Sequence, residues 1–200
     1  MSHFYLASVC DNKDPLHLGR IQVELALNGV PTKSDWLPLM TVQSGKGTGV
    51  WFVPELHDQV LVMFYDDHMQ HGFVMGSLWN QKTKPPLGGQ PTNKIIKTKS
   101  GSTLVFDDTK GKEQIFLATK DEKCSITFDQ KEKAITLKTE KAINITAKKG
   151  VFIKAETVSI TAKKTAGFKV ASFEAKTSSK GISFKAGQGI LAKGSSISLN

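Results

Sequence analysis

One short phrase repeats along CSITFDQKEKAITLKTEKAINITAKKGVFIKAETVSITA (124–162): two apolar residues flank a polar residue, and a polar turn follows. The first apolar positions of three successive phrases, Ile135, Ile143 and Val151, are eight residues apart, and Val158 follows after seven. This period is shorter than that of any helical solenoid, so it predicts β-structure with very small rungs. Similar phrases continue at 168–172, 182–186 and 197–200.

A rung of this size cannot hold itself together in a single chain. Two inward aliphatic side chains contribute roughly 3–6 kcal/mol when fully buried, whereas ordering the backbone of eight residues costs about 8–16 kcal/mol. If each strand forms only one wall, other chains must supply the remaining walls, and three walls make the smallest closed prism. We therefore predict an intertwined homotrimer, a triple-stranded β-helix, with Lys, Thr and Ser facing outward. Closing the prism also pairs strand edges that otherwise invite aggregation.

The predicted trimer core consists of the inward apolar positions of these phrases: Ile126, Phe128, Ile135, Leu137, Ile143, Ile145, Val151, Ile153, Val158, Ile160, Ile182, Phe184, Ile197 and Leu199. These are the residues that we expect to carry the function.

The amino-terminal half differs from this tail. Its apolar residues recur at period two between turns rich in Gly, Pro, Asn and Asp, which favours short strands. We expect six of them, at 4–10, 18–27, 36–42, 49–53, 59–65 and 72–79. Six short strands suit a small closed barrel of the OB kind. The fold class is therefore all-β, with an OB-fold-like barrel (1–84), a Pro/Gly linker (85–94), a neck (95–123) and the repetitive shaft (124–200).

The formal net charge of +9 raises an alternative function, a basic OB-fold protein that binds nucleic acid or another polyanion. The charge is concentrated in one half, because residues 1–93 carry a net −2 and residues 94–200 a net +11. Arg20 is the single arginine among the 27 basic residues. Arginine is the residue suited to bidentate phosphate contacts and base stacking, so we expect no nucleic-acid partner and interpret the lysines as a solvated outer surface.

Three segments resemble sites for phosphate binding, metal binding or glycoside hydrolysis, but their residues do not fit these functions well. SGKGTG (44–49) has Met40 where a phosphate loop needs its first glycine, and it precedes VWFVP rather than a helix. DDHMQH (66–71) offers possible metal ligands but equally suits a hairpin turn. Asp107 and Asp108 are adjacent, so in a strand they would face opposite sides rather than flank one glycosidic bond. We expect no catalytic residue, no metal and no cofactor, and reduced Cys10 and Cys124.

An ordered series of phrases is similar to the central spike proteins of contractile injection machines, which comprise phage baseplate spikes and VgrG-type spikes of type VI secretion. The barrel phrases are DPLHLGRIQVEL (14–25), SDWLPL (34–39), GKGTGVWFVPELHDQVLVMF (45–64) and GFVMGSLWNQKTKPP (72–86), and IKTKSGSTLVFDDTKGKEQIFLATK (96–120) resembles the family's neck. The resemblance implies an OB-fold, a trimeric β-prism and a structural role in puncturing a target cell envelope when a sheath contracts.

The resemblance also implies partners. Many relatives carry an amino-terminal hub domain, whereas this sequence starts at the barrel, so it is either a stand-alone spike or a piece of a larger one. We expect a baseplate hub protein at the barrel end. The sequence ends almost inside a rung and has no histidine after His71 for a metal-binding tip. We therefore expect a separate PAAR-type tip protein to dock on Ser198, Leu199 and Asn200.

The location of the protein follows from its first twenty residues and from the resemblance. These residues lack the basic start, apolar core and cleavage site of a secretion signal. We expect synthesis in the bacterial cytoplasm, incorporation into the baseplate of a virion or injection particle, and ejection on contraction.

Overall fold

The structure is a computed structural model that describes residues 3–27, 29–66, 68 and 70–167. The predicted core positions Ile182, Phe184, Ile197 and Leu199 and the predicted docking residues Ser198 and Asn200 lie outside the described residues. By its internal contacts the chain divides into Met1–Asn144 and Ile145–Asn200. Within the described residues there is no α-helix, and none of the helical turns is long and apolar enough to cross a membrane.

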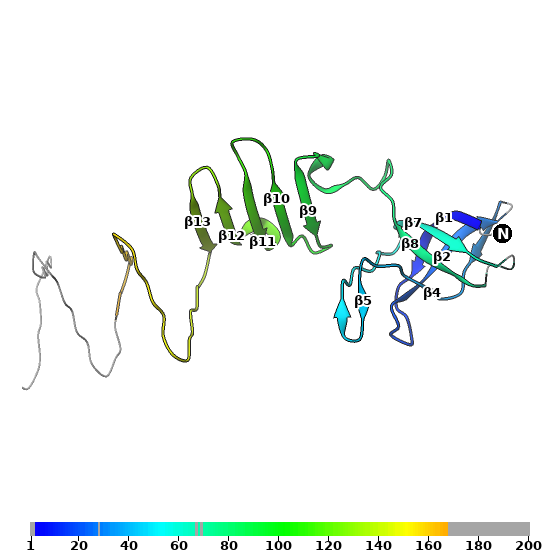
Figure 1. The fold of residues 1–200 in the computed structure, drawn as a ribbon, viewed down its shortest axis with the longest axis horizontal. Helices are drawn as coiled ribbons and strands as arrows, with labels where there is room; N and C mark the ends of the chain where they lie inside the picture. The colour runs from blue at the N-terminus through cyan, green and yellow to red at the C-terminus, as the bar shows by residue number, and fades with distance from the viewer. Residues whose placement is uncertain (1–2, 28, 67, 69, 168–200) are drawn as a thin grey trace, which may run out of the picture. The chain divides into compact units, whose positions relative to one another are not determined.

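The first part of the chain forms a closed antiparallel barrel (Figure 1). Its strands run in the order β3-β2-β1-β7-β8, and β4 pairs with β2. The circle closes beyond β4, where Leu39 forms a parallel bridge with Val74 and the Met40 N–H donates to the Val74 carbonyl at 2.8 Å. The strand bounds are β1 (His3–Asp11), β2 (Arg20–Leu27), β3 (Val30–Lys33), β4 (Leu37–Pro38), β7 (Gln59–Phe64) and β8 (Gly72–Ser77).

Strict alternation of buried and exposed residues builds the barrel core. In β7, Val60, Val62 and Phe64 are at most 1% exposed, while the residues between them face outward. This period-two pattern is what the sequence predicted for the strand. The buried cluster consists of Ala7, Val9, Ile21, Val23, Leu25, Leu37, Val60, Val62, Phe64 and Val74.

Three barrel segments differ from the predicted strands. The segment 36–42 is reduced to the two-residue β4. Of 49–53 only Gly49 is in a strand, because SGKGTG forms a hairpin of β5 (Ser44–Gly45) and β6 (Thr48–Gly49) that leaves Trp51 and Phe52 largely exposed. The stretch 30–33, which the sequence analysis placed in a turn, is the edge strand β3. The sequence did not predict this strand because it contains Pro31, and proline is tolerated in strands mainly at such edges.

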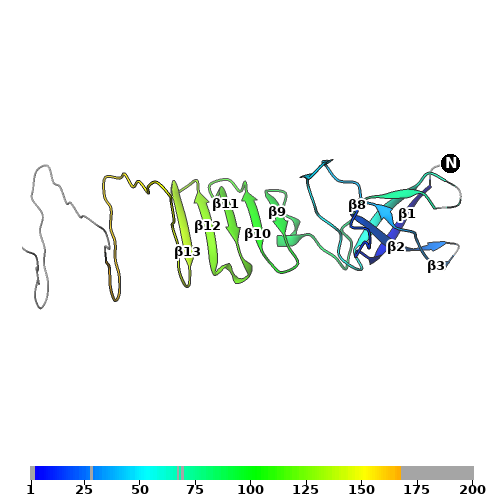
Figure 2. The same ribbon diagram turned by 90° about the horizontal axis from the view of Figure 1, so that it is seen from below.

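A second sheet follows the Pro-rich segment, whose central turn is the short helix η1 (Pro86–Gly89). Five consecutive antiparallel strands form it, each paired with the next (Figure 2). A second helical turn, η2 (Lys120–Glu122), precedes the fourth strand. The strands are β9 (Asn93–Lys97), β10 (Thr103–Asp107), β11 (Gln114–Ala118), β12 (Cys124–Asp129) and β13 (Ala134–Thr139). The sheet includes the predicted neck and the first two predicted rungs, and the boundary at 124 stays a prediction.

The rungs that the structure describes after β13 form no strand. Residues 140–167 belong to no strand, and no backbone hydrogen bond joins two residues within this described stretch. The phrases INITA (143–147), VFIKA (151–155) and VSITA (158–162) are exposed throughout. A strand needs a second backbone to bond with, so the predicted triple-stranded β-helix stays a prediction for this part of the chain.

Candidate assembly surface

One face of the second sheet carries two rows of apolar side chains. Residues directly opposite each other in an antiparallel pair lie on the same face, so the strand register defines each row. The first row is Ile96, Leu104, Leu117, Ile126 and Leu137. The second row is Phe106, Ile115, Phe128 and Ile135. We call this the apolar face.

Most of the apolar face is exposed in the described chain, and only Leu104 and Ile126 are half-buried. Ile135 is 67% exposed, Leu137 54% and Leu117 48%. The opposite face has buried positions instead, with Val105 at 7% and Ala118 at 5%. A contiguous exposed apolar patch of this kind marks an interaction site, so the apolar face is the candidate functional site of the second sheet.

The opposite face changes from apolar to polar along the sheet. Its central row consists of Ile95, Val105, Phe116, Thr127 and Thr136. Leu87 of η1 and residues 119–122, which include η2, line a hollow over its apolar part. In β12 and β13 this row consists only of threonines, flanked in the same strands by Ser125 and Lys138. This composition suits an outward surface.

Four of the predicted trimer-core residues lie in this sheet. The sheet brings Ile126, Phe128, Ile135 and Leu137 onto one face. The next predicted positions, Ile143, Ile145, Val151, Ile153, Val158 and Ile160, are each more than half exposed in the single chain. Whether these residues form a trimer core stays a prediction. Sequence reasoning missed five residues of the apolar face, Ile96, Leu104, Phe106, Ile115 and Leu117.

Polar groups mark two ends of the rows. Lys94 lies opposite Phe106 at the start of the second row, and its Nζ is 2.6 Å from Asp108 Oδ2. At one end of β12, Cys124 lies opposite Thr139, with Sγ and Oγ1 3.4 Å apart. Cys124 is exposed and shares its face with Ile126, two residues along the strand. A thiol therefore lies at the margin of the apolar face.

The single arginine has a structural partner in the barrel. Arg20 Nη2 donates to Asp14 Oδ1 at 2.7 Å, and the guanidinium carbon lies 6.0 Å from the centroid of the Trp36 ring. The Arg20 side chain holds the pKa of the Asp14 carboxyl well below its usual range. Because its guanidinium is occupied, Arg20 is poorly placed to bind a polyanion.

The acidic segments have local partners as well. The His71 ring Nδ1 lies 3.0 Å from Asp66 Oδ2. Partial burial opposes ionisation of Asp66, but the N–H groups of Gln70 and His71 and the His71 ring outweigh it, so its pKa is lowered. Asp107 accepts from the Thr109 N–H at 2.9 Å, and Thr109 lowers its pKa. Among the residues that the structure describes, no three potential ligands cluster as a metal site.

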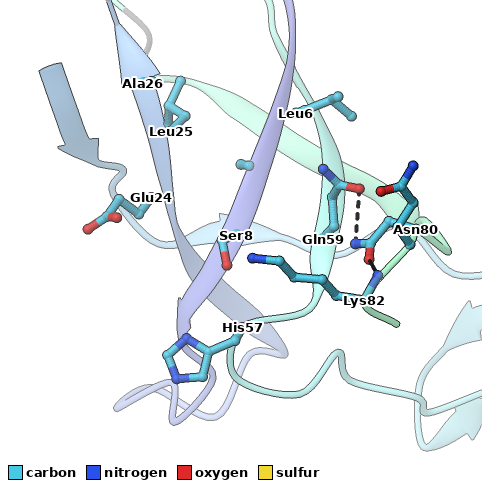
Figure 3. A pocket seen from close by; sticks show the side chains of 11 residues that line it. Leu6, Ser8, Glu24, Leu25, Ala26, His57, Gln59, Asn80 and Lys82 are labelled. Atoms are coloured by element: carbon cyan, nitrogen blue, oxygen red, sulfur yellow. Dashed lines mark hydrogen bonds between the residues drawn. The ribbon is translucent and has the colours of Figure 1, made fainter. Parts of the chain in front are cut away.

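A hollow of about 620 Å³ lies on the outer surface of the barrel (Figure 3). Ser8, Glu24, His57 and Lys82 line it. The Asn80 amide donates to Gln59 Oε1 at 3.3 Å and Asn80 Oδ1 accepts from the Lys82 N–H at 2.8 Å, which joins β7 to the loop after β8. Within the described residues, no hydrogen bond joins the Ser8 hydroxyl to the His57 ring.

Comparison with known families bears on the barrel. The family model of the type VI secretion system/phage-baseplate injector OB domain matches residues 5–79. This match contains the whole buried cluster, from Ala7 to Val74. The barrel is thus similar to the injector OB domain of these machines, and the match supports a role in baseplate or spike structure. No curated protein matches the chain.

Proposed function

We propose that this chain is the central spike of a contractile injection machine, a structural and non-enzymatic protein that punctures a target membrane. The observation that carries the proposal is the uncovered apolar face, from Ile96 to Leu137, in a chain whose barrel is similar to an injector OB domain. A baseplate component that stayed single would leave these rows in water. In a homotrimer, the apolar rows of the two other chains can pack against the apolar rows of each chain and cover them.

In the proposed trimer the apolar faces of three chains meet at one axis. Each sheet β9–β13 forms one wall of a prism, with its threonine and lysine surface outward. Residues 140–167 continue the walls as rungs whose unpaired N–H and C=O groups bond with neighbouring chains. Burial of the six exposed Ile and Val side chains between Ile143 and Ile160, together with these bonds between chains, then opposes the cost of ordering this backbone.

The proposed trimer acts mechanically. The OB barrels seat on a hub protein of the baseplate, and the shaft transmits the force of sheath contraction toward the target envelope. Interlocked chains distribute this load over many rungs. At the far end, Ser198, Leu199 and Asn200 are the proposed seat of a PAAR-type tip protein. The machine is a phage, an extracellular injection particle or a type VI secretion system, and the protein is made in the bacterial cytoplasm.

The deciding experiment is the mass of the full chain in solution by light scattering. We expect three times the 21.8 kDa of one chain at micromolar concentration. A mass of one chain at this concentration would refute the trimeric spike.

The alternative function, polyanion binding, rests on the net charge of +11 in residues 94–200. It is tested by titrating the chain with duplex DNA at physiological salt. The spike proposal expects weak binding, since the lysines are dispersed and Arg20 is held by Asp14. Tight binding that falls steeply with added salt would support the alternative instead.

A further inference from the structure

A groove of about 460 Å³ lies between the barrel and the edge of the second sheet, within the unit Met1–Asn144. Phe52 and Trp79 line it from the barrel, Pro86 from the linker and Ile96 from β9. An ion pair of Lys99 Nζ with Glu55 Oε2, 2.9 Å apart, also joins the turn after β9 to the barrel.

The aromatic residues of this groove are unusually exposed. Phe52 is 63% exposed and Trp79 66%. Phenylalanine and tryptophan are mostly buried in folded proteins and dominate the energetics of the interfaces that they join. The two residues come from different segments, one before β7 and one after β8, so the folded barrel brings together two large apolar groups that it does not itself cover.

The groove meets the edge strand β9, where Ile96 of the apolar face and Ile95 of the opposite face both line it. Ile96 also begins the first row, opposite Leu104. The exposed apolar surface therefore extends from Leu137 across the sheet to Ile96 and onto Phe52 and Trp79 of the barrel. A molecule that covers the apolar face up to its first strand reaches the edge of this groove.

We propose that a second copy of this chain fills the groove, so that the barrels take part in the contact between subunits. This inference rests on the proposed function, because the second copy is the neighbour that covers the apolar face. Three barrels are also held near one end of the shaft by short linkers with Pro85, Pro86 and Pro91, which raises their effective concentration. In a threefold assembly each chain then offers its groove to a different surface of the next chain.

The test compares two phenylalanines of the barrel by cysteine labelling in the full chain. Phe52→Cys places a thiol in the groove. Phe4→Cys is the matched control, because Phe4 is 58% exposed and lies in β1, away from the groove. Labelling with a maleimide is followed by peptide mass spectrometry, so that native Cys10 and Cys124 stay in place. Each rate is measured in the trimer and in a chain that also carries Ile135→Asp and Leu137→Asp to keep it monomeric.

We expect trimerisation to slow the labelling of Phe52→Cys about tenfold more than that of Phe4→Cys, because coverage protects a thiol in proportion to its burial. A trimer in which this difference is less than about fivefold would overturn the inference and leave the spike proposal standing. A wild-type chain that is monomeric by light scattering would overturn both. Because the samples contain no hub and no tip protein, protection reports a second copy alone.

Discussion

The Asp14 carboxylate is the common acceptor for the loop that leads into β2 and for Arg20, the first residue of that strand. Besides the Arg20 Nε, which donates at 3.0 Å, the backbone N–H groups of Leu16, Leu18 and Arg20 donate to Asp14 at 3.0, 2.9 and 3.2 Å. A 7% exposed carboxylate thus satisfies three turn amides and one guanidinium. The conformation of the loop before β2 therefore depends on the negative charge of Asp14.

Replacement of Asp14 by Asn should therefore destabilise the barrel, because the amide cannot balance the Arg20 charge and its nitrogen cannot accept from the loop. We expect the melting temperature to fall by on the order of 10 °C, measured by the combined fluorescence of the three tryptophans. Asp35→Asn, in the loop before β4, is the control and should have little effect. Equal melting temperatures for Asp14→Asn and wild type would contradict the role of Asp14.

The low pKa values of Asp14, Asp66 and Asp107 predict acid sensitivity of Met1–Asn144. A carboxyl whose pKa is lower in the folded state stabilises the fold above its unfolded pKa of about 4 and loses this contribution as the pH falls below it. Stability to urea should be constant from pH 7 to about 5 and fall below about 4. Asp14→Asn should show a shallower fall, and an unchanged slope would argue against this assignment.

A carboxylate introduced on one face of β13 should prevent trimer formation, whereas one introduced on the other face should not. Ile135→Asp would place three carboxylates at the axis of the proposed trimer without counter-charges, which costs several kcal/mol per ion through desolvation. Thr136→Asp, the neighbouring residue on the opposite face, should leave a trimer. Light scattering of the two variants distinguishes them. Trimers in both would show that the apolar face is not the assembly surface.

Backbone amides in residues 143–167 should be protected from hydrogen exchange in the assembled protein, although no backbone hydrogen bond joins residues within this stretch of the described single chain. We expect protection on the order of 100-fold relative to Ile135→Asp, measured by mass spectrometry. Exchange at the same rate in both proteins would mean that neighbouring chains do not pair with these rungs.

Two phenylalanines test the barrel core. Phe64 is 1% exposed, so Phe64→Ala should cost about 3–5 kcal/mol of unfolding free energy. Phe4 is 58% exposed, and Phe4→Ala should cost less than about 1 kcal/mol. Urea denaturation of each variant measures the difference. Similar losses would indicate that the outer surface of β1 is buried in the assembly.

The barrel was predictable because its strands alternate cleanly. In β2, for example, Ile21, Val23 and Leu25 point inward with the polar residues Gln22 and Glu24 between them. The apolar face of β9–β11 was not predicted, because apolar residues occupy both sides of these strands: Ile95 is followed by Ile96, and Val105 by Phe106. Adjacent apolar residues hide a period of two, so only the observed register separates the faces.

The later rungs show a different limit of sequence reasoning. Their eight-residue period predicts the inward positions, but a strand forms only where another backbone pairs with it. Ile143 and Val151 therefore lie in a single chain that has the extended shape of a rung without its bonds. In the proposed homotrimer, the pairing partners of these rungs are other copies of the same chain, which a single copy does not include.

The antiparallel sheet β9–β13 has one more consequence for the proposed trimer, which concerns the relative stagger of its three chains. Similar phrases about eight residues apart can align one phrase out of register at modest cost, as in any strand pattern that specifies register weakly. The first three strands of the sheet, β9–β11, precede the phrases and do not share their repeat, and the sheet forms from neighbouring segments of one chain. Its hairpins can fold early because their contacts are local. Three preformed sheets can pack against one another in one alignment only, and this alignment fixes the register between the three chains for every later phrase.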